Sequence, residues 1–325
     1  MSDIANLDKC PAVYVEYRCA LEPKHLAIAR DELNENEHTR GPALEQMRQF
    51  IAKHPQITRC RTDPLFLLMF LRNRKFNVVA ACESLEKYLT YRVVAKDFFY
   101  VKDPLDCDHL VKQGIFIPLD PDEEGRKVFY LRSGHYDPDS VLPEDVTRLG
   151  LLALEVYQEV EHYQVMGIVL LVDLKEMSLS HVANWTLTKL SIVTRAMNEV
   201  TFRWKQIHVF NIPKYTATFI ELAMRLISPK LRNRVVFHKS IDDLKAAIDE
   251  SVLPDIYGGK QSLEEANERF RQKVLEQRER ILKHAEMTID LSIPNPNSKN
   301  PANAALQSSV VDESVIGSFR KLNVD

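Results

Sequence analysis

The fold is decided by the stretch GIVLLVD at residues 167–173. Its unbroken apolar run leaves no polar face, which is typical of a strand that is covered on both sides in a parallel sheet. Similar short runs occur at residues 114–118, 127–131, 206–210 and 234–237. Helical patterns separate the later runs, and strands that alternate with helices predict right-handed crossovers. We therefore expect an α/β domain with a mainly parallel five-stranded sheet.

The region before this sheet is expected to be helical. From residue 23 to about residue 96, apolar side chains recur at intervals of three and four. Turn-forming residues divide this pattern at positions 41–42, 62–64 and 76–77. The segments predict a small N-terminal helical bundle.

The chain divides into five parts. A charged helix is expected after the sheet, because Ser262 and Glu265 form a capping box that opens a pattern running to about Met287. The final segment is rich in Asn, Ser and Pro, a composition typical of disorder. The five parts are an N-terminal arm (1–22), the helical domain (23–103), the α/β domain (104–260), the C-terminal helix (261–288) and a disordered tail (289–325).

Composition excludes several classes of protein. A chain of 325 residues with 45% hydrophobic and 27% charged residues is long enough for one large domain and a smaller one. Its longest apolar runs, at 65–71 and 165–172, are far shorter than the roughly 20 residues that cross a bilayer. The N-terminus lacks the regions of a secretory signal, and the five cysteines form no metal-ligand pattern. We expect a cytoplasmic protein with no bound metal or cofactor.

Catalytic signals are weak. The chain contains no nucleophile elbow, zinc-protease motif, P-loop or dinucleotide fingerprint. Asp173 lies near Ser178, Ser180 and His181, but a strand-to-helix turn capped by Ser180 explains this group more simply. Three nearby carboxylates are expected on the exposed face of a helix, at Glu155, Glu159 and Glu161. We therefore predict that the protein is not an enzyme.

Positive charge is concentrated between residues 189 and 239. This window holds ten Lys and Arg residues against two acids, a net charge of +8, whereas the whole chain carries −3, so the remaining residues sum to −11. Within it, Arg203-Trp204-Lys205 resembles the platforms that stack nucleic-acid bases. The acidity of the whole chain and the lack of a nucleic-acid motif argue against that class. The window instead suits an anionic membrane surface.

A helix with an unusually wide apolar face lies inside this window, at residues 215–228. At about 100° per residue its apolar side chains cover an arc of roughly 200°, whereas an ordinary surface helix needs a stripe little wider than about 100°. One interpretation is a helix deep in a core. The other is a gate that covers an apolar cavity and also meets a membrane. The gate residues would be Phe219, Ile220, Leu222, Ala223, Met224, Leu226 and Ile227.

Several cations around this helix are spaced so that their side chains can converge. On a strand, Arg203 and Lys205 point to the same face. Lys230 and Arg234 are neighbours if their segment is helical, and they line one side with Arg232 if it is extended. Because isolated surface cations are common, scattered solvated charges are the competing interpretation.

Three separated motifs resemble the CRAL-TRIO lipid-binding family. They are LLMFLRNRKFN at 67–77, IVLLVDL at 168–174 and VLPDIYGG at 252–259, in the order expected of that family. The similarity covers about residues 44–260 and is closest to the branch that contains alpha-tocopherol transfer protein, retinaldehyde-binding protein and the clavesins. It implies a helical N-terminal region and a CRAL-TRIO-type α/β domain, whose sheet floors a hydrophobic pocket closed by a mobile gate helix, here residues 215–228.

The resemblance also implies site residues. In the tocopherol-transfer branch a basic cluster beside the gate binds phosphoinositide headgroups, and the matching positions are Arg74, Arg203, Lys205, Lys230 and Arg234, with Arg232 alongside. The positions expected to contact lipid are Leu154, Ile168, Val172, Ile192, Met197, Val200 and Phe202. Arg195 and Lys239 depart from the family pattern, which leaves the identity of the cargo open.

These features predict a non-enzymatic intracellular carrier. It would bind a tocopherol- or retinoid-like lipid in a gated pocket and transfer it at phosphoinositide-containing membranes. We expect it to be cytoplasmic and to associate peripherally with endosomal or other intracellular membranes. Its expected partners are the hydrophobic ligand and the membrane surface, without nucleic acid. The alternative is a phosphoinositide-sensing vesicle-trafficking adaptor, whose C-terminal tail would dock a protein partner.

Overall fold

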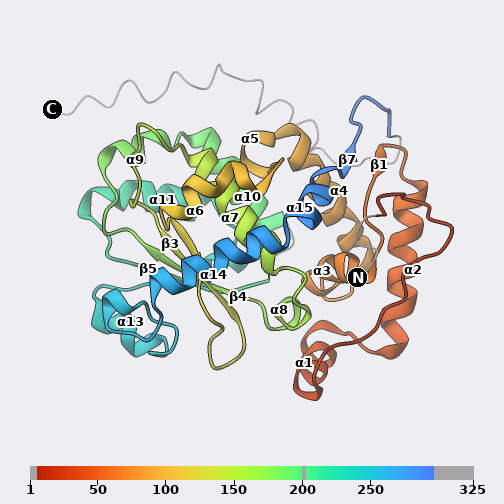
Figure 1. Ribbon diagram of the computed structural model, residues 1–325, viewed down its shortest axis with the longest axis horizontal. Coiled ribbons are helices and arrows are strands. Elements are labelled where there is room, and N and C mark those ends of the chain that lie inside the picture. The colour runs from red at the N-terminus through yellow and green to blue at the C-terminus, as the bar shows by residue number, and fades with distance from the viewer. Residues whose placement is uncertain (1–5, 200–202, 296–325) are drawn as a thin grey trace.

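The computed structural model describes residues 6–199 and 203–295. Its centre is a five-stranded sheet in the order β2-β3-β4-β5-β6, with helices on both faces (Figure 1). β2 pairs antiparallel with β3, and the other neighbours pair in parallel. The predicted mainly parallel sheet of an α/β fold is thus confirmed. The strands are β2 (Phe116–Pro118), β3 (Lys127–Arg132), β4 (Ile168–Asp173), β5 (Trp204–Phe210) and β6 (Val235–Phe237).

The central strand β4 is covered on both faces, as its apolar run predicts. Ile168 and Leu170 face a large hydrophobic cluster that also receives side chains from α7 (Pro143–Tyr157). Val169 and Leu171 face a second cluster, which includes residues of α13 (Ile241–Ala247) and α14 (Leu263–Glu276). The alternation follows from the strand geometry, because successive side chains point to opposite faces.

Helices before the sheet form the predicted bundle. They are α1 (Pro23–Leu33), α2 (Glu37–Lys53), α3 (Pro64–Asn73), α4 (Val78–Val94) and α5 (Lys96–Phe99). A core of Met47, Phe66, Phe70, Leu85 and Leu89 holds α2, α3 and α4 together. Asp63 and Asn77 cap α3 and α4, where turns were expected.

The break expected at positions 41–42 is wrong, because α2 continues through Pro42. Asn36 starts this helix upstream, where its side chain accepts hydrogen bonds from the backbone N–H groups of His38 and Thr39. Pro42 cannot donate a backbone hydrogen bond within the helix. This cap and the burial of Ala43 and Met47 compensate for that loss.

Shorter elements connect the sheet to its helices. They are η1 (Pro104–Cys107), α6 (Asp108–Lys112), α8 (Glu161–Met166), α9 (Leu179–Asn184), α10 (Leu187–Glu199), η2 (Lys214–Thr216), α11 (Ala217–Leu226), α12 (Pro229–Arg232) and η3 (Asp255–Tyr257). The cap of α9 is Ser178 rather than the expected Ser180, since the Ser178 hydroxyl accepts from the N–H of His181.

The C-terminal helix departs from its expected single span. It divides at Gln277 into α14 and α15 (Arg278–Ala285), and Phe270, Val274 and Ile281 form its buried apolar edge. A two-stranded sheet that was not expected then joins β1 (Ile57–Arg59) to β7 (Thr288–Ile289). The two strands are too short to be recognised as a pair from the sequence. They join the segment that follows α15 to the N-terminal bundle (Figure 1).

Three carboxylates expected on an exposed helix face are instead paired inside the molecule. Glu155 lies 3.0 Å from Arg92, Glu161 lies 2.7 Å from Arg72, and Glu159 pairs with Arg61 and Arg280. The arginines come from helices or loops distant in sequence, so no local pattern reveals them. The exposed-face prediction for Glu155, Glu159 and Glu161 is therefore wrong.

Within the described residues, no helix has both the length and the apolar character that crossing a bilayer requires. The segment 296–325, which makes up most of the tail predicted to be disordered, lies outside the described residues.

Candidate functional site

An apolar cavity lies between the sheet and helices α4, α7 and α10. Its volume is about 180 Å³, below the roughly 300–1,000 Å³ of typical ligand pockets. The wall is almost wholly apolar and includes Tyr91, Leu151 and Leu170. Trp185 and Trp204, the two tryptophans of the chain, both line it. The site therefore suits one hydrophobic molecule, and its occupancy can be followed by tryptophan fluorescence.

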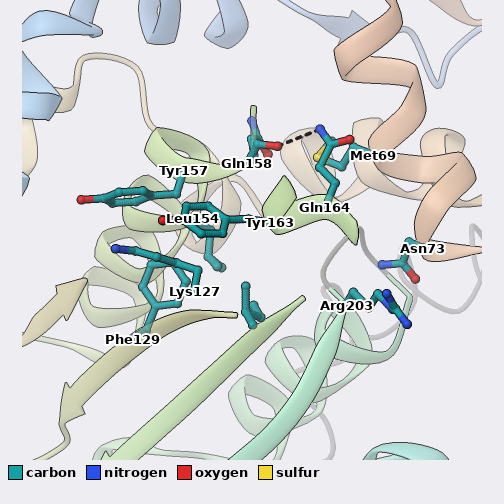
Figure 2. A pocket seen from close by; sticks show the side chains of 11 residues that line it. Met69, Asn73, Lys127, Phe129, Leu154, Tyr157, Gln158, Tyr163, Gln164 and Arg203 are labelled. Atoms are coloured by element: carbon teal, nitrogen blue, oxygen red, sulfur yellow. Dashed lines mark hydrogen bonds between the residues drawn. The ribbon is translucent and has the colours of Figure 1, made fainter. Parts of the chain in front are cut away.

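A second, mixed cavity of about 30 Å³ lies beside the first. Figure 2 shows Lys127, Tyr157 and Tyr163 at one end of it and Asn73 and Arg203 at the other. Burial lowers the pKa of Lys127 to about 7. The ammonium group lies 4.0 Å from the ring centroid of Tyr157, a cation–π contact. This cavity thus has a basic side chain at each end.

The lipid-contact positions expected from the sequence are divided among several places. Leu154 lines both cavities, Ile168 lines the mixed cavity and Met197 lines the apolar cavity. Ile192 instead packs in a small cluster with residues of α4 and α5, and Val172 packs against the main core. Two further positions lie outside the described residues, Val200 and Phe202. The contact of these residues with lipid stays a prediction.

Most aromatic residues of the apolar cavity were not identified from the sequence. Tyr88, Phe99 and Phe116 come from α4, α5 and β2. In the sequence these residues look like any other apolar side chain that packs in a core. Their convergence depends on how the helical bundle is placed on the sheet, which a local pattern does not encode.

Helix α11, the predicted gate, packs beside the apolar cavity. All ten of its residues are described and none is fully buried, so the deep-core interpretation is wrong. Phe219 lies 6.5 Å from the Trp185 ring, and Ile220 and Met224 also pack partly against the main core. Leu222, Ala223 and Leu226 are half-buried, whereas Ile227, after the end of α11, is buried.

Trp185 and α10 therefore form the cavity wall on this side, and α11 packs outside them. The direct cover expected of α11 is not seen in this arrangement, because α10 lies between that helix and the cavity. Movement of α11 as a gate stays a prediction.

The structure brings cations together in a group that we call the cation cluster. Its members are Arg74, Lys75, Arg203, Lys230 and Arg234. Burial and the positive charges of the other four members hold the pKa of Lys230 below its usual value. Burial and Arg203 likewise lower the pKa of Arg234. Neighbouring cations of this kind create a positive potential that favours the approach of an anion.

Backbone contacts fix the two arginines of the cluster that lie at the sheet. Arg203 donates to the carbonyl of Val165, and Arg234 donates to the carbonyl of Trp204. Gly167 permits the close approach, since it adopts φ +84° and a Cβ there would lie 2.5 Å from the Arg203 carbonyl oxygen. The parallel pairing of β5 and β6 places the starts of both strands at the same edge.

Two further predicted cations lie around this edge in different contacts. Lys205 lies 3.1 Å from Glu32 of α1, and the same carboxylate pairs with Arg203. Arg232 is exposed and donates to the carbonyl of Ile227, beyond the end of α11, at 3.3 Å. Their binding of a headgroup stays a prediction, as it does for the cation cluster.

Sequence reasoning missed Lys75 and Glu32. Lys75 stands beside the predicted Arg74, so the basic pair in the turn between α3 and α4 was a usable signal. Glu32 carries no comparable signal, because it reaches β5 from a helix about 170 residues away in sequence. Only the packing of α1 on α8 brings it there.

Asp173, which was a weak catalytic signal in the sequence, connects parts of the fold. Its carboxylate accepts hydrogen bonds from the hydroxyls of Tyr130 at 2.7 Å and Tyr257 at 2.5 Å, and from the amide of Asn211 at 2.9 Å. Ser178 and His181 bond to each other within the cap of α9. These contacts connect β3, β4 and the segment after β5, and they account for the buried position of Asp173.

Comparisons with known proteins identify relatives of this chain. The model of the CRAL/TRIO domain matches residues 111–259. Clavesin-2 from Homo sapiens is 30% identical over 247 residues, which cover 74% of this chain and 76% of clavesin-2. Clavesin-1 from Xenopus laevis is 29% identical over 246 residues, 74% of each chain. The crystal structure of Sfh5 aligns over 75% of this chain and 99% of that chain, with a TM-score of 0.43 and 13% identity. The resemblance predicted from three motifs is confirmed, and this chain belongs to the CRAL-TRIO family.

Proposed function

We propose that this protein is a non-enzymatic lipid carrier, which encloses one hydrophobic molecule in the apolar cavity and exchanges it at membranes that contain phosphoinositides. The main support for the proposal is that the apolar cavity adjoins the cation cluster through the mixed cavity. Leu154 lines the apolar and the mixed cavity, and Arg203 lines the mixed cavity and belongs to the cation cluster. An apolar chamber thus adjoins a surface suited to phosphate.

The apolar cavity supplies what a carrier must provide. Moving a lipid with about 20 buried carbons into water costs about 16 kcal/mol, at roughly 0.8 kcal/mol per carbon. A chamber with an almost wholly apolar wall removes most of this cost. A tocopherol- or retinoid-like molecule belongs to the proposed class, because it is largely apolar. A cavity of about 180 Å³ must widen to take such a molecule whole.

The cation cluster supplies reversible membrane contact. Five cations at roughly 1 kcal/mol each contribute about 5 kcal/mol near an anionic bilayer. This is enough for peripheral adhesion and too little for a permanent anchor, which suits a protein that leaves with its cargo. Endosomal or other intracellular membranes with phosphoinositides are the proposed place of exchange.

Helix α11 is the proposed gate of the apolar cavity. Its apolar side chains are half-buried, so a bilayer can receive them at modest cost to the folded protein. It contacts the cavity wall through α10 and Trp185. Headgroups bound at the cation cluster would favour an open arrangement only to the extent that they bind it more tightly than the closed one.

Ligand binding and transfer together test the proposal. Lipids extracted from the purified protein are identified by mass spectrometry, and the lipid found is then titrated while tryptophan fluorescence is followed. Transfer is measured from donor vesicles to acceptor vesicles with and without phosphatidylinositol bisphosphate. We expect saturable quenching and faster transfer to the phosphoinositide vesicles. Equal rates to both acceptors would contradict the membrane part of the proposal.

A matched pair of substitutions tests the cavity itself. Val193→Trp places a large ring in the apolar cavity, whereas Val79→Trp adds the same ring at a position on α4 that is 72% exposed. We expect only Val193→Trp to reduce the amount of bound lipid, with vesicle binding unchanged in both. Equal lipid content in the two variants would show that the cargo lies elsewhere.

A further inference from the structure

The carboxylate of Glu32 occupies donors that the proposed headgroup site needs. Glu32 pairs with Arg203 and lies 3.1 Å from the Nζ of Lys205. Arg203 also donates to the carbonyl of Val165, so its guanidinium is engaged on two sides. A phosphate that approaches these two cations meets a negative group of the protein already in place.

Helix α1 itself is fixed to the rest of the molecule. Ala29 and Leu33 are fully buried in a cluster with Val165 and Met166 of α8. The ring of His25 stacks on His162 at 5.4 Å, and the amide of Asn34 donates to the carbonyl of Lys75 at 3.2 Å. The last contact joins the end of α1 to the turn that carries part of the cation cluster.

Glu32 is ionised at neutral pH. Partial burial acts to raise its pKa, but the hydrogen bonds and charges of Lys205 and Arg203 outweigh burial, so the pKa lies below its usual value. The side chain is 47% exposed, so solvent can reach the carboxylate and it can swing away from β5 without opening the core. These properties are those of an internal anion that an external anion can displace.

We propose that Glu32 is an internal competitor for phosphate at Arg203 and Lys205, which weakens headgroup binding until a phosphorylated ligand displaces it. The inference rests on the proposed function, since it requires that these cations bind phosphate. Displacement restricts tight binding to ligands whose phosphates replace the lost ion pairs. Weakly charged surfaces are then bound less strongly than the number of cations suggests.

The test compares Glu32→Gln with Asp31→Asn. Both substitutions remove one negative charge from α1, but Asp31 is 62% exposed and pairs with Arg30. Binding is measured to phosphatidylcholine vesicles with and without phosphatidylinositol bisphosphate, and to soluble inositol trisphosphate. We expect Glu32→Gln to tighten binding of the phosphoinositide vesicles and of the soluble headgroup about threefold to fivefold, the range of exposed ion pairs. Asp31→Asn should change either affinity less than twofold.

The outcomes separate this inference from the proposed function. If the unmodified protein prefers phosphoinositide vesicles but both variants shift equally, Glu32 is no competitor and the function stands. The same conclusion follows if Glu32→Gln leaves inositol trisphosphate binding unchanged. If the unmodified protein shows no preference for the phosphoinositide, the proposed function fails and this inference fails with it. Thermal unfolding of both variants confirms that each is folded.

Discussion

Arg72 and Arg74 are separated by one residue, yet they belong to two different electrostatic regions. Arg72 is fully buried and lies 2.7 Å from both Glu35 and Glu161. Burial alone would lower its pKa, but these carboxylates raise it above its usual value. Arg74 belongs to the cation cluster, where Lys230 and Arg234 have lowered pKa values.

The contrast separates charges that stabilise the fold from charges that we propose bind a ligand. A buried cation persists only when acids compensate it. Cations that repel one another at a surface reduce stability slightly and gain free energy when an anion arrives. The same residue type therefore has opposite uses, which depend on whether carboxylates or other cations surround it.

The largest effect is expected from Arg72→Met, which tests this comparison directly. The substitution leaves Glu35 and Glu161 without one buried partner, so we expect a loss of about 3–5 kcal/mol in the free energy of unfolding. Urea denaturation measures it. Lys75→Met, an exposed change in the turn after α3, is the control and should cost less than about 1 kcal/mol. Similar losses in both variants would remove the distinction between the two regions.

The double substitution Lys230→Gln and Arg234→Gln tests the other region. At roughly 1 kcal/mol per cation, vesicle binding should weaken about 30-fold, and transfer to phosphoinositide vesicles should slow. Stability should change by less than about 1 kcal/mol, because the relief of repulsion offsets the lost hydrogen bond from Arg234 to the carbonyl of Trp204. Lys239→Gln with Lys245→Gln makes the same change of charge beyond the far end of β6 and should weaken binding less than about threefold. If this control pair weakens binding equally, total charge rather than the cation cluster is responsible.

Lys127 sharpens the comparison, because it is buried against Tyr157 and the carbonyl of Leu119. The folded protein releases its proton near pH 7, whereas the unfolded chain keeps it to about pH 10.5. Between these values the unfolded state binds more protons, so this group makes stability rise with pH. Below about pH 7 its full penalty is present.

Lys127→Met should therefore stabilise the protein by about 1–2 kcal/mol at pH 6.5, with a gain that shrinks by pH 9.5. Urea unfolding at the two pH values measures the difference. Lys273→Met changes an exposed lysine on α14, near the same ring of Tyr157, and should give no pH-dependent gain. A gain for Lys127→Met that is equal at both pH values would refute the burial argument.

The smallest effect is expected from removal of residues 296–325. The deletion keeps β7 and the contact between Gln56 and the carbonyl of Ile293, which is 2.6 Å long. A carrier should transfer lipid at an unchanged rate after this deletion, since both cavities and the cation cluster remain. A rate below about half that of the full chain would favour the adaptor alternative, in which the tail has the main role.

Local sequence patterns were sufficient to predict most of the fold. The apolar run of β4 and its alternation with helices predicted the parallel sheet, because strand and helix periods are short-range properties. Caps such as Asp63 and Asn77 marked helix starts for the same reason. The positive window from residue 189 to residue 239 likewise indicated a basic surface before any contact was known.

Tertiary structure alone decided which polar groups face inward and which cations meet. Glu155 and Glu161 looked like solvated residues, and buried arginines from the N-terminal helices reversed that interpretation. Glu32 reached the start of β5 only because α1 packs on α8. The apolar cavity is likewise a space between elements, and no residue encodes it. Periodicity records which side of an element is apolar, whereas pairing and enclosure depend on groups brought together over long sequence separations, which a single sequence does not specify.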